Sequence, residues 1–210
     1  MCSSDLDLRI FHDAPGGGNL GSFGAVSDGL AAEGRVLAIA MNAGMYHPDR
    51  RPVGLLVENG TERAPLVTAE GPGNFGLLPN GVFCIADRGF SVVESRAFAA
   101  APPACRFASQ SGPMLVIDGA LHPRFLKDSD SRYVRNGVGV SADGRTAWFA
   151  ISASPVNFET FGRLFRDVLK TPNALYFDGK ISRLYAPELG RNDFGFAMGP
   201  IVGLTVPKGQ

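Results

Sequence analysis

Short apolar runs separated by tight-turn dipeptides run through this chain, and they constrain its fold more than any other feature. Asn-Gly occurs at residues 59–60 and 80–81, and Asp-Gly occurs at residues 118–119 and 143–144. These dipeptides supply the positive φ angles that tight hairpin turns require. Apolar runs of roughly four to eight residues bounded by such turns are typical of strands. The pattern therefore predicts a β-rich domain with mixed or antiparallel sheets.

The runs between the turns have the residue content of strands. The clearest hairpin spans residues 138–149, where apolar side chains flank Asp143-Gly144. The segments that fit a strand are residues 8–12, 36–41, 53–58, 81–86, 90–94, 114–117, 137–141, 146–152, 174–177 and 201–206.

One segment has the period of a helix instead. Apolar side chains recur on one helical face over residues 158–170, after the N-cap candidate Asn157 and before Pro172. This spacing predicts one long amphipathic helix, and a weaker pattern predicts a shorter helix over residues 24–32. Because the long helix lies between two apolar strands, residues 146–177 are expected to form a β-α-β crossover.

Length and charge narrow the class of protein. The chain has 210 residues, which suits one domain, and we predict a single α+β domain over residues 7–207. Lys and Arg together number 20, as do Asp and Glu, so the formal net charge is +0. We therefore expect no nucleic-acid partner and no attraction to an anionic membrane by bulk charge. No apolar stretch reaches the roughly 18 residues of a membrane span, and the oligomeric state is left open.

Residues 1–6 differ from the rest of the chain. Cys2-Ser3-Ser4-Asp5-Leu6 is what one reading frame of a common sequencing adapter encodes, and the apolar alternation starts directly afterwards. We expect these residues to be a non-native remnant, to be left out of fold reasoning, with the native N-terminus missing. The alternative is an ordinary polar tail.

Two further cysteines leave a choice between thiols and a disulfide. Cys84 lies in an apolar run and Cys105 follows two prolines. Their spacing fits no zinc pattern. Because free cysteine is among the most buried residue types, two structural thiols are favoured over a disulfide.

Polar residues follow or precede buried strands at four places. They are residues 42–47, residues 109–113 with Asp118-Gly119, residues 133–137, and residues 178–182. Taken singly, each fits a turn or a solvated strand end. Chemistry in a β-rich domain is expected where such groups gather at strand ends.

Several of these blocks occur in an order that carries a family resemblance. The blocks are residues 42–47, 71–75, 80–83, 111–116, 135–139 and 174–179. As a set they resemble the phosphodiester glycosidase family, which includes the lysosomal uncovering enzyme, and above all its bacterial branch. The resemblance covers about residues 8–206, nearly the whole domain. It implies hydrolysis of a glycosidic bond in a sugar-1-phosphodiester, and a periplasmic or secreted location.

The residues themselves suit that reaction. An ordinary glycosidase uses two carboxyl groups, whereas the strand-end motifs offer one strong carboxylate, Asp178. Phosphate can leave as an anion if a cation stabilises it, and Arg135 has the planar fork that matches phosphate. We predict Asp178 as base or nucleophile and Arg135 as the phosphate clamp.

The rest of the predicted site binds substrate. Asn42 would bind sugar hydroxyls or an N-acetyl group, Ser111 and the Gly112 N–H would contact phosphate, and His47 is a candidate acid–base group. The remaining substrate-binding candidates are Gly44, Asn136, Gly179, Ser182 and Arg191. No metal and no cofactor is predicted, and the partner is a carbohydrate phosphodiester.

One departure from the family pattern bears on which sugar the site accepts more than on which reaction it performs. Members near the uncovering enzyme carry Asp-Gly-Gly-Gly-Ser-Ser where this chain has Asp178-Gly179-Lys180-Ile181-Ser182.

Two other functions stay open. One is a non-catalytic cell-envelope module that binds glycan, which would not require Asp178. The other is a metal-dependent phosphoesterase with Asp178, Asp118 and Asp128 or Asp130 as oxygen ligands.

Overall fold

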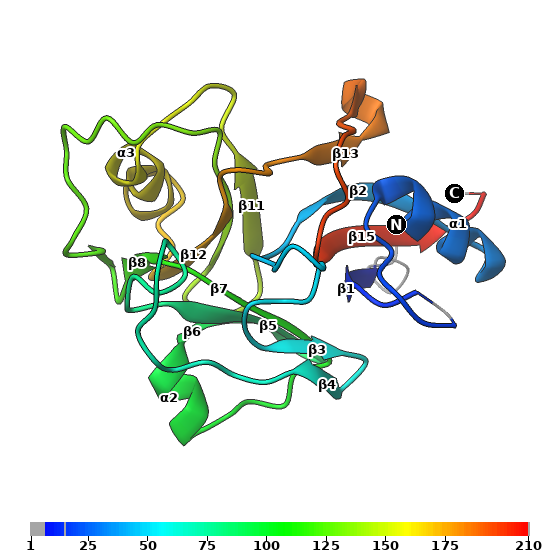
Figure 1. Cartoon of the computed structure of the whole chain (residues 1–210), viewed down its shortest axis with the longest axis horizontal. Helices are drawn as coiled ribbons and strands as arrows, with labels where there is room; N and C mark the ends of the chain where they lie inside the picture. Colours follow the sequence, from blue (N-terminus) through cyan, green and yellow to red (C-terminus); the bar gives the residue numbers. More distant parts are fainter. Residues whose placement is uncertain (1–6, 15, 210) are drawn as a thin grey trace.

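The fold is built almost entirely from antiparallel strands. The computed structural model describes residues 7–14 and 16–209, so the remnant predicted at residues 1–6 lies outside the described residues. Within them, fifteen strands form three five-stranded sheets, and every pairing between named strands is antiparallel (Figure 1). The β-rich prediction is confirmed.

The first sheet joins the two ends of the described chain. In spatial order it holds β1 (Asp7–Phe11), β15 (Ile201–Pro207), β2 (Arg35–Asn42), β13 (Leu184–Ala186) and β14 (Arg191–Asn192). The second sheet holds β4 (Thr61–Ala64), β3 (Leu56–Glu58), β7 (Phe107–Ser111), β5 (Gly81–Ala86) and β6 (Gly89–Glu94). The third holds β11 (Ala147–Ile151), β10 (Asn136–Val140), β12 (Asn173–Asp178), β8 (Met114–Ile117) and β9 (Ala120–Leu121).

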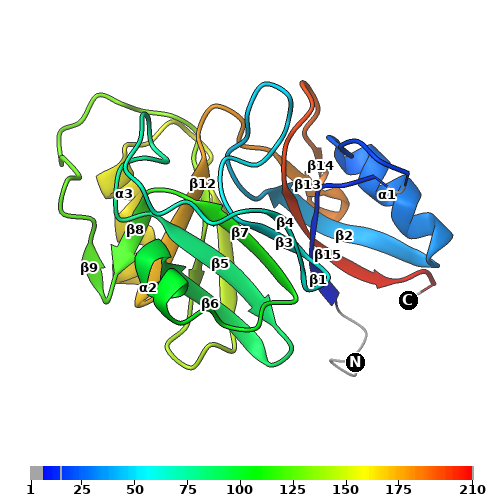
Figure 2. The same cartoon turned by 60° about the horizontal axis from the view of Figure 1, so that its bottom comes forward.

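Each sheet carries one α-helix on its outer side, as the two views agree (Figures 1 and 2). Helix α1 (Phe23–Ala32) packs on the first sheet, α2 (Ser95–Ala100) on the second, and α3 (Phe158–Arg163) on the third. A π-helical segment, η1 (Leu164–Val168), continues α3, and a 3₁₀ turn, η2 (Pro187–Leu189), lies between β13 and β14. None of the helices in the described ranges has the length and apolar character needed to cross a membrane.

The main core lies where the three sheets meet. Met41 comes from the first sheet, Phe83 from the second and Phe177 from the third, and all three belong to one buried cluster. Phe83 packs edge-on against Phe177, with 6.4 Å between the ring centroids. Burial of such side chains contributes roughly 1.5–3 kcal/mol each, so the shared core fixes the sheets relative to one another.

The β-α-β crossover predicted over residues 146–177 is present. Strands β11 and β12 both pair with β10 in antiparallel fashion, so they run in the same direction on either side of it. The chain between them contains α3 and η1, which cover the sheet by burying Phe161 and Phe165, respectively, against β8 and β12.

The prediction of one long helix over residues 158–170 is wrong. Regular α-helix ends at Arg163, after which Leu169 N–H donates to Leu164 O, five residues back. The wider turn rotates the later side chains away from the predicted stripe, so Phe165 is buried while Val168 is 68% exposed. The predicted N-cap is confirmed, because Asn157 Oδ1 accepts from Thr160 N–H at 2.9 Å.

Turn dipeptides give mixed results. Asn59-Gly60 and Asp118-Gly119 have positive φ at both residues and join β3 to β4 and β8 to β9, as expected for tight hairpins. Asn80-Gly81 is not a hairpin turn. Asn80 is fully buried and its side-chain Nδ2 donates to Phe75 O at 2.9 Å, while Gly81 begins β5.

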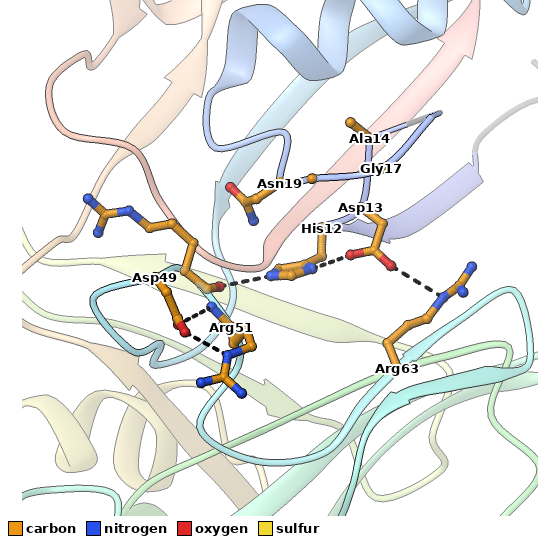
Figure 3. Close-up of a pocket in the computed structure, with 10 residues that line it drawn as sticks. His12, Asp13, Ala14, Gly17, Asn19, Asp49, Arg51 and Arg63 are labelled. Atoms are coloured by element: carbon orange, nitrogen blue, oxygen red, sulfur yellow. Dashed lines mark hydrogen bonds and ion pairs between the residues drawn. The ribbon is translucent and has the colours of Figure 1, made fainter.

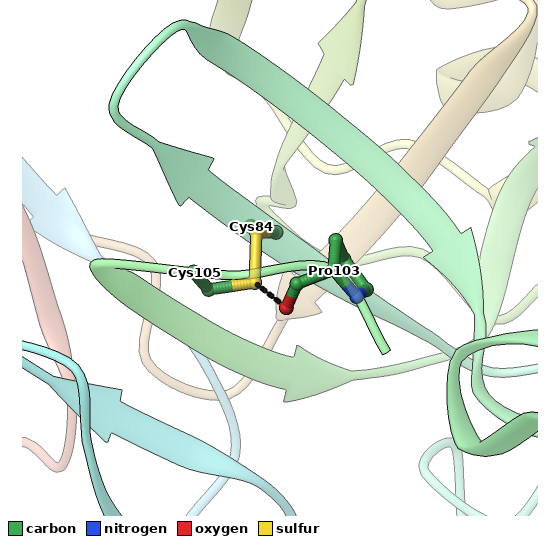
Figure 4. The surroundings of a disulfide bond; sticks show 3 residues. All are labelled: Cys84, Pro103 and Cys105. Carbon is green, nitrogen blue, oxygen red and sulfur yellow. Dashed lines mark hydrogen bonds between the residues drawn. A yellow bond between two sulfur atoms is a disulfide. The ribbon is translucent and has the colours of Figure 1, made fainter. Parts of the chain in front are cut away.

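The preference for two free thiols is also wrong. Cys84 and Cys105 form a disulfide with 5.5 Å between the Cα atoms (Figure 4). Cys84 lies on β5, and Cys105 precedes β7, which pairs with β5. No strand is predicted at β7 from the sequence, and it is the pairing of β7 with β5 that brings the two cysteines side by side.

Candidate active site

The site is a cleft of about 780 Å³ at the carboxyl end of β12. Its walls are the segment after β2, the segment that precedes β5, the loop before β10 and the turn after β12. The lining residues are Met45, Tyr46, His47, Pro48, Arg50, Val53, Pro72, Gly73, Asn74, Phe75, Ser131, Tyr133, Tyr176, Asp178, Gly179, Lys180, Ile181 and Phe196.

Asp178 is the one carboxylate among these lining residues. It ends β12, and its Oδ1 accepts the backbone N–H groups of Gly179 at 2.6 Å and Lys180 at 2.9 Å. Burial raises the pKa of Asp178, although these backbone hydrogen bonds oppose the rise. The carboxylate is therefore held in one position and is more basic than an ordinary aspartate.

Two buried asparagines brace the strand end from below the cleft. Asn42 and Asn136 are both fully buried, and Asn136 Nδ2 donates to Asn42 Oδ1 at 3.0 Å. Asn136 Oδ1 accepts the Asp178 N–H at 3.1 Å, while Asn42 Oδ1 also accepts the Arg183 N–H at 3.0 Å. Ser182 Oγ closes the network by donating to Asp178 O at 2.9 Å. The network ties β2 and β10 to the turn that carries Asp178.

Arg135 lies behind the cleft wall and is fully buried. Its guanidinium carbon lies 3.6 Å from the centroid of the Phe158 ring, with the rings of Tyr133 and Tyr176 at 5.5 and 5.3 Å. Nε and Nη2 donate to the carbonyls of residues 156 and 131. Burial lowers the pKa of Arg135.

No carboxylate pairs with Arg135 in the described residues, and its buried Nη1 has no hydrogen-bond partner there. Positive charge that is shielded from water and has no counter-ion creates a favourable field for an anion nearby. Arg135 is one side chain removed from the cleft, because Tyr133 and Tyr176 contact Arg135 and also line the cleft.

The structure brings some predicted site residues into the cleft and leaves others outside it. Asp178, Gly179 and His47 line it, and Arg135 lies directly behind its wall. Asn42, Asn136 and Ser111 are buried and Ser182 is half-buried, and none of the four lines the cleft; Ser111 Oγ donates to Phe177 O at 2.8 Å. Their predicted contacts with substrate are untested, and in this structure their polar groups bond to the protein itself.

The other predicted residues have packing roles in this structure. A Cβ on Gly44 would lie 2.8 Å from Ser109 Oγ, and one on Gly112 would lie 2.6 Å from Asn80 Cβ, so both positions need glycine for close packing. Arg191 Nη2 is paired with Asp193 Oδ2 at 2.5 Å on β14 and does not line the cleft.

Sequence reasoning missed the aromatic and cationic lining. Tyr176 lies within the apolar strand β12, where a tyrosine is expected to pack in the core, and only the fold shows that it lines the same cleft as Tyr46, Tyr133 and Asp178. Burial, and then the charge of Asp178, raise the pKa of Tyr46. Lys180 adds a positive charge at the rim of the cleft.

A second cavity of about 430 Å³ shares the lining residue Arg50 with the cleft. His12 Nδ1 contacts Asp13 Oδ1 at 2.7 Å, and Asp13 Oδ2 lies 3.5 Å from Arg63 Nε (Figure 3). His12 Nε2 lies 2.9 Å from the carbonyl oxygen of Arg50, a residue with φ 73° that lines both cavities. This contact holds the left-handed backbone at Arg50 in place.

The described residues contain no group of three or more His, Cys, Asp or Glu side chains arranged to hold a metal ion. Asp118 lies in the turn between β8 and β9, while Asp128 and Asp130 lie in the loop between β9 and β10.

Comparison with known proteins identifies the family. The family model described as phosphodiester glycosidase matches residues 35–196. This chain belongs to the phosphodiester glycosidase family. The uncharacterized protein YigE of Escherichia coli (strain K12) is 35% identical to this chain over 178 residues, which are 85% of the present chain and 69% of YigE. The family predicted from the motif blocks is confirmed.

Two solved structures share the fold of this chain. The catalytic domain of zebrafish N-acetylglucosamine-1-phosphodiester alpha-N-acetylglucosaminidase, auto-inhibited by its pro-peptide, has a TM-score of 0.60 and 13% identity, covering 93% of this chain and 72% of that one. A hypothetical protein from Synechocystis has a TM-score of 0.59 and 13% identity, covering 97% of this chain. The present chain spans 57% of the Synechocystis chain.

Proposed function

We propose that this member of the phosphodiester glycosidase family hydrolyses the bond between a sugar and the phosphate of a sugar-1-phosphodiester. The observation that carries the proposal is the single lining carboxylate, Asp178, in a cleft that also holds aromatic rings and positive charge. The name of the zebrafish relative supports N-acetylglucosamine as the first sugar to test.

One carboxylate is enough for this reaction because of the leaving group. Most glycosidases need a second carboxyl group to protonate a departing sugar oxygen. A phosphate monoester departs as a stable anion and needs no such proton. The bond from C1 to the bridging oxygen breaks, its electron pair stays on the phosphate, and water supplies the hydroxyl at C1.

Asp178 would act at C1 in one of two ways. As a base it takes a proton from the attacking water, and as a nucleophile it forms a glycosyl ester that water then hydrolyses. Both roles require the ionised carboxylate, and a raised pKa makes that carboxylate a stronger base. The backbone N–H groups of Gly179 and Lys180 fix its direction.

The positive and aromatic groups suit the two halves of the substrate. Arg135 and Lys180 place positive charge near the cleft, where it would stabilise the departing phosphate. The rings of Tyr46, Phe75 and Phe196 line the cleft and offer flat apolar surfaces to a sugar ring.

We propose that the chain works in the periplasm or outside the cell. The Cys84–Cys105 disulfide supports this location, because disulfides persist in oxidising compartments and are rare in the cytosol.

The test is release of free N-acetylglucosamine from an N-acetylglucosamine-1-phosphodiester, followed by other sugars if the first is not cleaved. Wild type is compared with Asp178→Asn and with Asp28→Asn, an exposed carboxylate on α1, each with and without EDTA. We expect turnover by wild type and Asp28→Asn, loss in Asp178→Asn, and no effect of EDTA.

Other results would favour the alternative functions. Binding of the phosphodiester without turnover by folded wild type, over the whole sugar panel, would indicate a glycan-binding module. Turnover abolished by EDTA and restored by a divalent cation would indicate a metal-dependent phosphoesterase.

A further inference from the structure

Strand β12 directs a tyrosine to the same cleft as the catalytic candidate. Tyr176 and Asp178 both line the cleft, on either side of a register shift in the pairing of β12 with β10, while Leu175 and Phe177 pack into the main core. Tyr176 is only 1% exposed, yet it lines the cleft. A Cβ on Gly179 would lie 2.1 Å from the Tyr176 hydroxyl oxygen, which places this hydroxyl against the turn that carries Asp178.

The buried cation lies directly behind this tyrosine. The Arg135 guanidinium carbon is 5.3 Å from the Tyr176 ring centroid. Phe158 packs edge-on against the same ring, with 4.8 Å between centroids, and lies under the guanidinium. The ring and the guanidinium are thus fixed relative to each other by one shared neighbour.

Arg135 does not line the cleft in this structure. Two of its donor nitrogens are engaged by the carbonyls of residues 156 and 131. Tyr176 contacts Arg135 and is itself a lining residue, and its hydroxyl lies against Gly179, which also lines the cleft. Burial, and then the charge of Asp178, raise the pKa of Tyr176, although Arg135 lowers it, so the hydroxyl keeps its proton and can donate.

We propose that the Tyr176 hydroxyl donates a hydrogen bond to a phosphoryl oxygen of the substrate, and that Arg135 positions and polarises it from behind. This inference rests on the proposed function and names the group that recognises the phosphate. Tyr176 keeps its proton throughout, since the C1–oxygen bond breaks with its electron pair going to the phosphate. Arg135 is then a positioning residue, and Tyr176 touches the leaving group.

Two substrates of the same sugar separate this role from a structural one. The first is the sugar-1-phosphodiester, and the second is the glycosyl fluoride, whose leaving group has no phosphoryl oxygen. Tyr176→Phe keeps the ring that packs on Phe158 and removes only the hydroxyl. We expect its kcat on the phosphodiester to fall by roughly 10²-fold, as for loss of one preorganised donor, while hydrolysis of the fluoride stays at the wild-type rate.

Matched variants complete the experiment. Tyr185→Phe removes a hydroxyl on β13, outside the cleft lining, and should leave both rates unchanged. Arg135→Lys keeps the positive charge and should lose less phosphodiester activity than Arg135→Met, with fluoride hydrolysis alike in both. Thermal unfolding of each variant checks that it is folded.

Each outcome bears on the inference. Selective loss of phosphodiester turnover in Tyr176→Phe supports it. Equal loss on both substrates, or loss on neither, overturns it while leaving the proposed function standing. Wild type that cleaves the fluoride but no phosphodiester, or cleaves neither, overturns the proposed function and the inference together.

Discussion

Asn136 Nδ2 donates to both oxygens of Asn42, to the side-chain Oδ1 at 3.0 Å and to the backbone oxygen at 2.8 Å. The pair joins the first sheet to the third, because Asn42 ends β2 and Asn136 begins β10. Neither side chain is exposed to solvent. The same Asn136 also holds the Asp178 backbone, so the contact between two sheets and the position of the carboxylate depend on one amide.

Replacing Asn136 should therefore affect stability and catalysis together. Asn136→Ala leaves the Asn42 amide and the Asp178 N–H without their partner, at about 1–3 kcal/mol for each buried group. We expect a loss of at least about 2 kcal/mol in the free energy of unfolding, measured in urea, and a lower kcat. The exposed Asn192→Ala on β14 is the control, and equal stability of the two variants would contradict the buried network.

The pKa of Asp178 predicts an unusual dependence of stability on pH. Its pKa is raised in the folded state above the ordinary value of 3.8, so between these two pKa values the folded protein binds more protons than the unfolded chain. Stability contributed by this group is fully present below pH 3.8 and is lost as pH rises through the raised pKa.

The measurement is urea unfolding of wild type and Asp178→Asn over a pH series. Wild type should lose stability relative to Asp178→Asn as pH rises above about 4. Hydrolysis by wild type should show the opposite trend and fall on the acid side of the same raised pKa, because the reaction needs the carboxylate. A stability difference that does not change with pH would contradict the raised pKa.

The π-helical segment makes a prediction about two neighbouring apolar residues. Phe165 is fully buried against the third sheet, whereas Val168 is 68% exposed. Phe165→Ala should cost about 3–5 kcal/mol, while Val168→Ala should change stability by no more than about 0.5 kcal/mol. Chemical denaturation measures both, and a large cost at Val168 would indicate a continuous α-helix instead.

The disulfide predicts a thiol count and a stability difference. The chain has three cysteines, so the unfolded protein purified without reductant should show one reactive thiol and, after reduction, three. A link between residues 21 apart should stabilise the fold by about 3 kcal/mol relative to the reduced protein. Unfolding with and without reductant measures this, and three thiols before reduction would overturn it.

The sequence predicts strands well where their side chains are apolar and their turns are explicit. Strands β5 and β8 have the predicted bounds, and the other predicted strands lie close to theirs, although the one expected over residues 53–58 forms only as β3. Strand β7 was missed because Ser109, Gln110 and Ser111 are polar, yet all are buried. Their side chains bond to backbone groups far along the chain, as Gln110 Oε1 does with Leu55 N–H at 3.0 Å. Nothing local in the sequence shows such partners.

The candidate site, too, could be predicted from the sequence only in part. Asp178 can be found from sequence because an Asp-Gly pair follows an apolar strand, and the structure places it in the cleft. The buried state of Arg135 and the cleft position of Tyr176 depend on how β12 packs against the loop before β10. Asn42, a predicted substrate-binding residue, is instead buried and bonded to Asn136, and this partner could not be found from the sequence because it is 94 residues away.

The pairing of β1 with β15 constrains how the chain can be made. Asp7 lies opposite Thr205, 198 residues later, and β15 lies between β1 and β2 and pairs with both. During synthesis on the ribosome, β1 therefore emerges long before its partner. The first sheet can close only after β15 has also emerged, and until then its early strands expose unpaired edges of the kind that favour aggregation.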